Sequence, residues 1–279
     1  VAIGDSSTAS GTDAIAIGGH AFAAGSLASG TRSTAIGQSV TAAGQSAIAI
    51  GDGSQASNTN SIAIGTGNNV SGANSGAIGD PNTITGSGSY ALGNNNSIAA
   101  NNAFAIGNNI SIAAGRDGSV GIGDGTTVAA PNSGAFTLNG GTAAATAPTA
   151  VVSVGSAGGE RQLTHVAAGV VSASSTDAIN GSQLFTVATA ANNLGNSLES
   201  VTGGGLVINV DGTIATAPSI TAAGATHNNV TAAIQALNSA NTTSNNGLAS
   251  ALGGGAAVAA NGSVTAPSYV IGGNTYNDV

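Results

Sequence analysis

The feature that most restricts the fold is a short apolar unit that returns at a fixed interval. The sequence Ala-Ile-Ala-Ile-Gly stands at 14–18 and again at 47–51, and variants of it fill the first half of the chain. The glycine that ends the unit occupies positions 4, 18, 37, 51, 65, 79, 93, 107 and 123. Most steps are 14 residues, and we interpret the longer steps to 37 and 123 as loop insertions. A fixed period of this kind is typical of a solenoid.

Each period has room for two short strands and two turns, but not for a pair of helices. A second apolar position follows most of these glycines: Ala9, Ala23, Ala56, Val70, Ile84, Ile98, Ile112 and Val128. The alternation Ile-Ala-Ile places isoleucine on one face of a strand and alanine on the other. Glycine gives the backbone freedom that a tight corner needs, and asparagine-rich corners at 94–96 and 108–109 fit left-handed turns. We therefore expect stacked coils of parallel strands.

The side chains of such a coil are small. Of 279 residues, 45 are glycine, 41% are hydrophobic and only 5% are charged. One coil therefore buries little apolar surface against the entropy lost when its backbone is ordered. An oligomer that also covers the second strand face is favoured.

A different pattern follows in the second half of the chain. Apolar residues recur there with steps of three and four at Leu184, Val187, Ala191, Leu194, Leu198 and Val201. This spacing predicts the seam of a coiled coil, which requires partner helices. The spacing does not choose between a dimer, a trimer and a tetramer.

Three ordered segments lie just before and at the start of this seam. They read SVG at 153–155, ERQLTHVAAG at 160–169 and TDAINGSQL at 176–184. They closely resemble the neck of the YadA-like trimeric autotransporter adhesins, which are surface fibres of Gram-negative bacteria. The 14-residue repeats resemble the head of the same family, and residues 60–65 come nearest to its repeat.

The resemblance implies a mainly β fold. The head would be a trimeric left-handed parallel β-roll, followed by a neck and a trimeric coiled-coil stalk with β-inserts. The chain would form a homotrimer on the bacterial cell surface, anchored in the outer membrane in the full-length protein. We expect the present sequence to be an extracellular segment of that longer protein.

A second repeat interrupts the stalk. Segments 203–205, 211–214 and 217–219 return at 253–255, 261–264 and 266–268. Each copy predicts short strands around an Asp-Gly or Asn-Gly turn, and it resembles the β-inserts of the family. Between the copies a second seam is formed by Val230, Ile234, Leu237, Asn241, Ser244, Leu248 and Ala251.

These patterns predict seven consecutive segments. They are a head at 1–139, an insert loop at 140–152 that crosses to a neighbouring subunit, a neck at 153–183, a coiled coil at 184–202, a β-insert at 203–227, a coiled coil at 228–252 and a second, truncated β-insert at 253–279.

Candidate site residues come from the head and from the neck. The candidate ligand-binding repeat is Asn60, Ser61, Ile62, Ala63, Ile64 and Gly65, and the candidate trimer contacts of the neck are Arg161, His165, Asp177, Asn180 and Gln183. Arg161 is expected to form an ion pair between chains or to cap carbonyls within the neck, and the alternative is a solvated surface arginine. Asp177 is a candidate N-cap for a helix that begins near Ala178.

Asn241 is a polar residue in a seam. Three such amides in a trimer could surround an anion on the axis, because a core asparagine often fixes register or oligomeric state. The alternative is a frayed, hydrated helix near Gly247.

The sequence indicates no catalysis, no cofactor and no metal. A phosphate-binding P-loop lysine is impossible because the chain has no lysine. The three histidines stand far apart, without a second ligand at metal spacing. A net charge of −8 disfavours nucleic acid and anionic lipid. No run of 18 apolar residues occurs, so we expect no direct membrane contact from this segment.

The function that we expect is adhesion. The outer side of the head coils would bind host extracellular matrix, such as collagen, fibronectin or laminin, or molecules of the host cell surface. The first alternative is a structural spacer that displays a more distal head. A phage-fibre-like trimeric solenoid would not be expected to carry this neck, and an ice-binding solenoid would need regularly spaced threonines that the strands lack.

Overall fold

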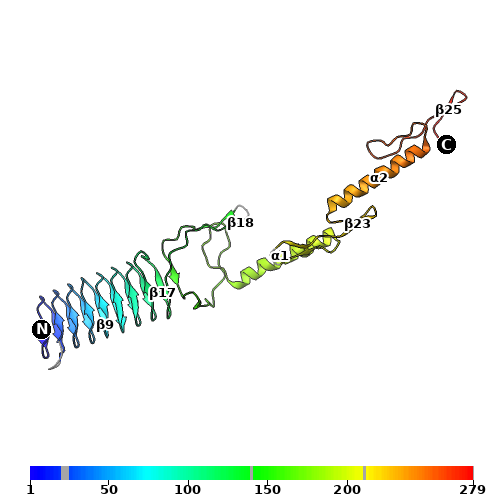
Figure 1. The fold of residues 1–279 in the computed structure, drawn as a ribbon. Helices are drawn as coiled ribbons and strands as arrows, with labels where there is room; N and C mark the ends of the chain where they lie inside the picture. Colours follow the sequence, from blue (N-terminus) through cyan, green and yellow to red (C-terminus); the bar gives the residue numbers. More distant parts are fainter. Residues whose placement is uncertain (20–24, 139–140, 210–211, 279) are drawn as a thin grey trace. The chain divides into compact units, whose positions relative to one another are not determined.

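A computed structural model describes residues 1–19, 25–138, 141–209 and 212–278. The chain divides into two compact units after Ala178. Figure 1 shows the first unit as a stack of short strands and the second as two helices with hairpins beside them.

The first unit contains a ten-stranded parallel sheet. Its strands, in sheet order, are β1 (Ala2–Ile3), β3 (Ile15–Ile17), β5 (Thr34–Ile36), β7 (Ile48–Ile50), β9 (Ile62–Gly65), β11 (Gly76–Gly79), β13 (Tyr90–Leu92), β15 (Phe104–Ile106), β17 (Val120–Ile122) and β20 (Val152–Ser153). Ile48 pairs with Ile62, one period later in the sequence. The expected stack of parallel coils is therefore confirmed.

An eight-stranded parallel sheet forms the other side of the coils. Its strands are β2 (Thr8–Ala9), β4 (Leu27–Ala28), β6 (Thr41–Ala42), β8 (Gln55–Ala56), β10 (Asn69–Val70), β12 (Asn82–Ile84), β14 (Asn96–Ile98) and β16 (Ser111–Ile112). Ala9 pairs with Ala28. Ala28 also pairs with Ala42, so Ala28 occupies the position that we expected for Ala23, which lies outside the described residues.

The core lies between the two sheets and is narrow. The alanines of the ten-stranded sheet point inward, whereas the isoleucines that flank them point outward. Ala63 and Ala77 are fully buried, as are Val70 and Ile84 from the other sheet. From β10 onward the eight-stranded sheet contributes valine or isoleucine opposite these alanines, whereas β4, β6 and β8 contribute alanine. The core of each coil is therefore thin.

Polar groups inside the coil are paired with one another. Asn68, Asn82 and Asn96 lie one above the other in successive coils and are buried. Each donates its amide to a carbonyl at the end of a strand, those of Gly79, Gly93 and Gly107 respectively. These bonds offset the desolvation of the buried amides.

The region after the last full coil differs from the expected loop. Two short strands, β18 (Thr137–Leu138) and β19 (Gly141–Thr142), pair as an antiparallel hairpin. Val152 of β20 then pairs with Val120 of β17. The ten-stranded sheet therefore continues to Ser153, past residue 139, where we expected the head to end.

The second unit repeats one pattern of helix and hairpins. Its elements are α1 (Gly181–Thr202), β21 (Val207–Ile208), β22 (Ile214–Thr216), β23 (Ile220–Ala222), β24 (Ala225–His227), α2 (Val230–Leu252), β25 (Tyr269–Ile271) and β26 (Asn274–Tyr276). The pairs β21–β22, β23–β24 and β25–β26 are antiparallel. Helices occur where both seams predicted them.

Equivalent hydrogen bonds recur in the two inserts. Ser219 N donates to Gly204 O at 2.7 Å, and Ser268 N donates to Gly254 O at 2.6 Å. The turn that contains Gly262 is closed by its N–H, which donates to Ala259 O at 2.8 Å. Asp211, which precedes the corresponding Gly212, lies outside the described residues.

Candidate functional site

The two outer faces of the head differ in polarity. The outer face of the ten-stranded sheet is apolar and partly exposed at Ile3, Ile15, Ile78, Tyr90, Leu92, Phe104, Ile106 and Ile122. Tyr90 and Phe104 stack on neighbouring strands, with ring centroids 6.2 Å apart. An apolar face of this kind marks an interaction surface.

The outer face of the eight-stranded sheet is polar except at Leu27. Its outward residues are Thr8, Leu27, Thr41, Gln55, Asn69, Thr83, Ser97 and Ser111. Within the described part of the head, no charged residue lies on a strand, and the carboxylates and arginines sit in the turns. A partner on this face would be held by hydrogen bonds and van der Waals contacts rather than by ion pairs.

Two members of the predicted ligand-binding repeat are internal. Ser61 and Ala63 are fully buried. Ser61 Oγ donates to Asn58 O at 2.6 Å and accepts from Asn58 N at 3.2 Å. These two residues therefore stabilise the turn and the core, and the sequence could not separate them from surface residues of the same repeat.

The other members reach the surface at different places. Asn60 is exposed at a corner, with φ of 54°, and its Nδ2 donates to Asn74 Oδ1 at 2.9 Å. Ile62 and Ile64 lie on the apolar outer face, and Gly65 ends the strand with φ of 126°. The repeat thus divides between a corner and the apolar face.

Asparagines form a second row at another corner. Asn95 and Asn109 adopt the predicted left-handed conformation. Asn95 Nδ2 donates to Asn109 Oδ1 at 2.7 Å, and Asn109 Nδ2 donates to Asp124 Oδ1 at 2.9 Å. This exposed row joins successive coils.

Arg161 closes the end of the coil stack. Its Nη1 donates to Val154 O at 2.6 Å, and its Nη2 donates to Asp124 O at 2.7 Å. The guanidinium lies over Gly123, where an added Cβ would approach Cζ to 2.8 Å. These contacts match the carbonyl-capping interpretation, with one carbonyl in the neck and one in the last coil. The ion pair between chains stays a prediction.

The N-cap prediction for Asp177 was wrong. Helix α1 begins at Gly181, and its N-cap is Asn180. Asn180 Oδ1 accepts from Gln183 N, and Gln183 Oε1 accepts from Asn180 N, both at 3.2 Å. This reciprocal capping box satisfies two backbone donors. Asp177 Oδ2 instead accepts a hydrogen bond from Val170 N at 2.9 Å and thereby joins two segments of the neck.

Two further neck residues, His165 and Glu160, make local contacts within the neck. His165 is exposed, has φ of 61°, and places Nδ1 3.1 Å from Thr164 Oγ1. Gly158 N donates to Glu160 Oε1 at 2.9 Å, and this bond, with a second from the backbone of Glu160 itself, lowers the pKa of that carboxyl.

Both seams lie exposed in the single chain. Leu184 is 65% exposed, Leu194 71% and Val201 84%. In α2, Ile234 is 60% and Leu248 53% exposed. Side chains of this type are rarely left in water along one helix stripe, so the exposure marks a contact surface.

Asn241 lies on the exposed surface of α2. Its Oδ1 is 3.5 Å from Asn245 Nδ2, which donates to Gly262 O at 2.9 Å. The axial anion stays a prediction.

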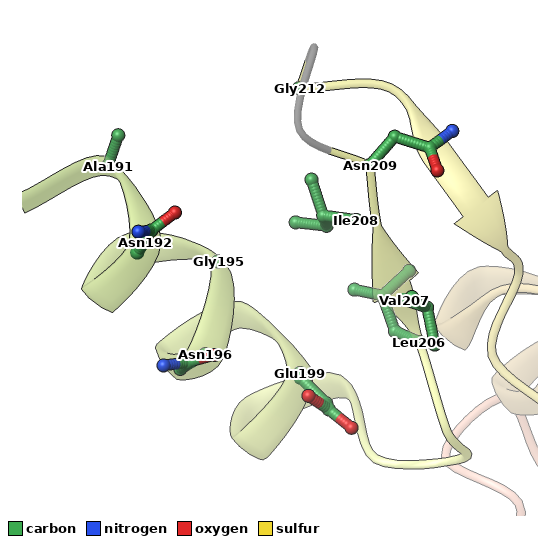
Figure 2. Close-up of a pocket in the computed structure, with 10 residues that line it drawn as sticks. All are labelled: Ala191, Asn192, Gly195, Asn196, Glu199, Leu206, Val207, Ile208, Asn209 and Gly212. Atoms are coloured by element: carbon green, nitrogen blue, oxygen red, sulfur yellow. The ribbon is translucent and has the colours of Figure 1, made fainter. Parts of the chain in front are cut away.

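Each insert forms a groove with the helix before it. Figure 2 shows the first groove, of 690 Å³, in which helical residues such as Asn192, Gly195 and Glu199 face Leu206 and Ile208. The second groove, of 520 Å³, lies at positions 50 residues later and is lined by Asn238, Asn241, Thr242, Asn245, Asn246, Val258, Ala259, Ala260, Asn261 and Gly262.

The two grooves differ at one helical position. Asn245 donates to the turn carbonyl of Gly262, whereas the first helix has Gly195 there. An added Cβ at Gly195 would lie 3.6 Å from Ile208 Cδ1, an ordinary contact. The first groove therefore lacks the side-chain bond that ties the second helix to its insert.

Among the residues that the structure describes, no three His, Asp or Glu side chains group as metal ligands do. In the same residues, no helix combines the length and the apolar character that crossing a membrane requires.

Two family models match the chain. One, described as the YadA head domain repeat, matches residues 1–21, 24–39, 28–54, 42–68 and 56–80. The other, described as the coiled stalk of trimeric autotransporter adhesin, matches residues 162–207. The first lies on the coils, and the second on the neck, α1 and the start of the first insert. This chain carries YadA-like head repeats and a stalk segment of the trimeric autotransporter adhesin type.

Two sequence relatives carry adhesin names. The chain is 47% identical over 75 residues to the autotransporter adhesin EhaG of Escherichia coli O157:H7, which is 27% of this chain and 4% of the relative. It is 58% identical over 48 residues to the autotransporter adhesin BtaE of Brucella suis biovar 1, strain 1330, which is 17% of this chain and 6% of the relative. The aligned part is thus a small fraction of each YadA-like relative.

Two solved structures are also similar. The C-terminal YadA-like domain of a Burkholderia pseudomallei protein aligns with a TM-score of 0.34 and 33% identity, over 53% of this chain and 62% of that one. The collagen-binding domain of the Yersinia adhesin YadA aligns with a TM-score of 0.36 and 24% identity, over 62% and 96%. The YadA-like fold of this chain rests on its strand pairing and on the family models rather than on these alignments.

Proposed function

We propose that this chain is part of a homotrimeric, non-enzymatic adhesin on the surface of a Gram-negative bacterium. Its full-length protein is anchored in the outer membrane. The head binds host extracellular matrix proteins, with collagen, fibronectin and laminin as candidates, or molecules of the host cell surface. The observation that carries the proposal is the pairing, in one chain, of an apolar sheet face with an uncharged polar face on the opposite side.

The apolar face supports assembly. Its column of isoleucines and aromatic side chains is continuous along the sheet, as the in-register pairing of Ile64 with Ile78 illustrates. Burying such a column against other copies removes apolar surface from water. The exposed seams of α1 and α2 are also apolar surfaces that other copies would cover. Head and stalk therefore both favour association.

The polar face supports ligand contact. It stays available when the opposite sheet is covered, and it repeats small hydroxyl and amide groups from coil to coil. A repetitive partner could be held at many weak contacts along such a face. The names of both sequence relatives, autotransporter adhesins, support an adhesive role.

Binding to immobilised collagen, fibronectin and laminin tests the proposal. The informative variant is Asn69→Asp on the polar face, and the matched control is Asn108→Asp at an exposed corner. We expect at least one matrix protein to bind, Asn69→Asp to weaken it, and Asn108→Asp to leave it unchanged. Absence of binding to all three and to cultured cells would contradict the adhesive role and favour a spacer.

A further inference from the structure

Four asparagines in the chain are followed directly by glycine: Asn139, Asn180, Asn246 and Asn261. In this sequence the backbone nitrogen of glycine can reach the preceding side-chain amide, because glycine has no side chain to hinder the approach. Asn139 lies outside the described residues. The structure places the other three in different surroundings.

Two of them are held in place by helix structure. Asn246 lies inside α2, where the helical backbone fixes the position of Gly247 N. Asn180 is the N-cap of α1, and its Oδ1 accepts from Gln183 N at 3.2 Å and from Ser182 Oγ at 2.8 Å. Reaction at either residue requires part of a helix to unwind first.

Asn261 is exposed in the turn of the second insert. Its Oδ1 accepts from Ser263 N at 3.1 Å and from Ser263 Oγ at 2.7 Å. These two donors withdraw electron density from the amide carbon and make it more reactive toward a nucleophile. Gly262 N is adjacent, and its N–H is held by one bond to Ala259 O at 2.8 Å.

The turn needs less free energy to open than a helix does. Its two arms pair at one isolated bridge, between Val258 and Val264, and one side-chain bond, from Asn245 Nδ2 to Gly262 O, ties it to α2. Short exposed hairpins of this kind lie at the low end of local stability. Gly262 N is therefore released more often than the corresponding nitrogen within a helix.

We propose that Asn261 is a site of spontaneous deamidation. Gly262 N loses its proton and attacks Asn261 Cγ, a C–N bond forms, and ammonia leaves with the proton. The product is a cyclic succinimide. Water then opens it at Cγ to give aspartate, or at the backbone carbonyl to give isoaspartate.

Aspartate and isoaspartate should have different effects on the conformation of the turn. The first insert already has Asp211 before Gly212 at the corresponding position, so aspartate suits this turn. Isoaspartate adds a methylene to the backbone and displaces the Ser263 donors. In both cases each chain gains one negative charge, which the stalk carries permanently because the reaction is irreversible.

Peptide mapping by mass spectrometry tests the inference on the intact chain. The protein is incubated in mildly alkaline buffer, folded in one sample and unfolded in guanidinium in another, and the extent of deamidation at each asparagine is measured over time. In the folded sample we expect Asn261 to react at least tenfold faster than Asn180 and Asn246. In the unfolded sample the three rates should converge.

Substitution provides the matched control. Asn261→Gln should abolish the change in that peptide, because glutamine can cyclise only to a six-membered imide, which forms far more slowly, and it should leave the rates at Asn180 and Asn246 unchanged. Equal rates at the three residues in the folded chain, or faster reaction at Asn180, would overturn the inference.

Discussion

Asn82 donates a hydrogen bond of 2.8 Å from Nδ2 to Oδ1 of Asn68 in the interior of the head, where both side chains are buried. Asn82 Oδ1 in turn accepts from Asn96 Nδ2 at 2.8 Å and from Asn96 N at 3.1 Å. This row joins three coils through side chains as well as through the sheets. It also fixes the register, since a coil shifted by one residue would leave buried amides unpaired.

Asn82→Ala should destabilise the head. The substitution removes the donor to Asn68 Oδ1 and the acceptor of Asn96, and each buried group left unpaired costs about 1–3 kcal/mol. We expect unfolding in denaturant to show a loss of about 2–4 kcal/mol per chain. Asn108→Ala is the control: it removes one exposed acceptor, which takes a bond from Asn94 N at 3.0 Å, and should change the free energy of unfolding by less than about 1 kcal/mol. Equal effects from the two would contradict the structural role of the row.

Arg161→Ala should weaken the end of the coil stack. Its charged hydrogen bonds to the carbonyls of Val154 and Asp124 are lost, and bonds of this type contribute about 1.5–3 kcal/mol. Hydrogen exchange should rise near β17 and β20 before it rises in the central coils. Arg116→Ala is the control, because the bond of Arg116 goes to the adjacent carbonyl of Gly115. Unchanged exchange after Arg161→Ala would show that the cap has no structural role.

Gly195→Asn should stabilise the first insert. The added amide can reach the turn carbonyl of Gly212 as Asn245 reaches Gly262, and the helix loses an unfavourable glycine. We expect a gain of about 0.5–1 kcal/mol in the free energy of unfolding of the second unit. Gly247→Asn, at a helical glycine without a turn beside it, separates helix propensity from the new bond. If both substitutions give the same gain, the bond does not form.

Glu160 should contribute stability that depends on pH. Its pKa is lowered in the folded chain by backbone donors, chiefly Gly158 N. The charged form is therefore favoured by folding, so the contribution is present above the ordinary glutamate pKa and is lost as pH falls through the lowered value. Melting temperatures of the native chain and of Glu160→Gln should differ at neutral pH and converge in acid. A difference that persists in acid would point to another cause.

Leu194→Lys should disrupt the stalk. Leu194 lies in the exposed seam of α1, and a charge there cannot be buried between helices without a large desolvation cost. Asn193→Lys, one residue away on the same helix, is the control. We expect circular dichroism to show a lower melting temperature of α1 for Leu194→Lys and little change for Asn193→Lys. Identical melting would contradict a packed seam.

The period predicted the coils because backbone pairing between coils requires equal spacing. Ile48 and Ile62 pair at the predicted interval, and the insertion before Leu27 left the register of Ala28 intact. The sequence did not show which strand face points inward. Alanine faces inward because the two sheets of one coil lie too close together for isoleucine on both sides.

Other features depend on side-chain contacts that a period does not reveal. The buried row of Asn68, Asn82 and Asn96 resembles turn asparagines in sequence, although its recurrence at the third position after three successive strand-end glycines is a usable signal. The N-cap fell to Asn180 instead of Asp177 because Gln183 completes the capping box. Within the candidate repeat, Ser61 and Ala63 were not distinguishable from surface residues until their burial was seen.

The most direct measurement is the mass of the folded chain in dilute solution by sedimentation equilibrium. We predict a single species of three times the chain mass, because association covers the apolar sheet faces and the seams and the matching stalk model describes trimeric adhesins. A folded species with the mass of one chain would contradict the assembly, and with it the adhesive-fibre function.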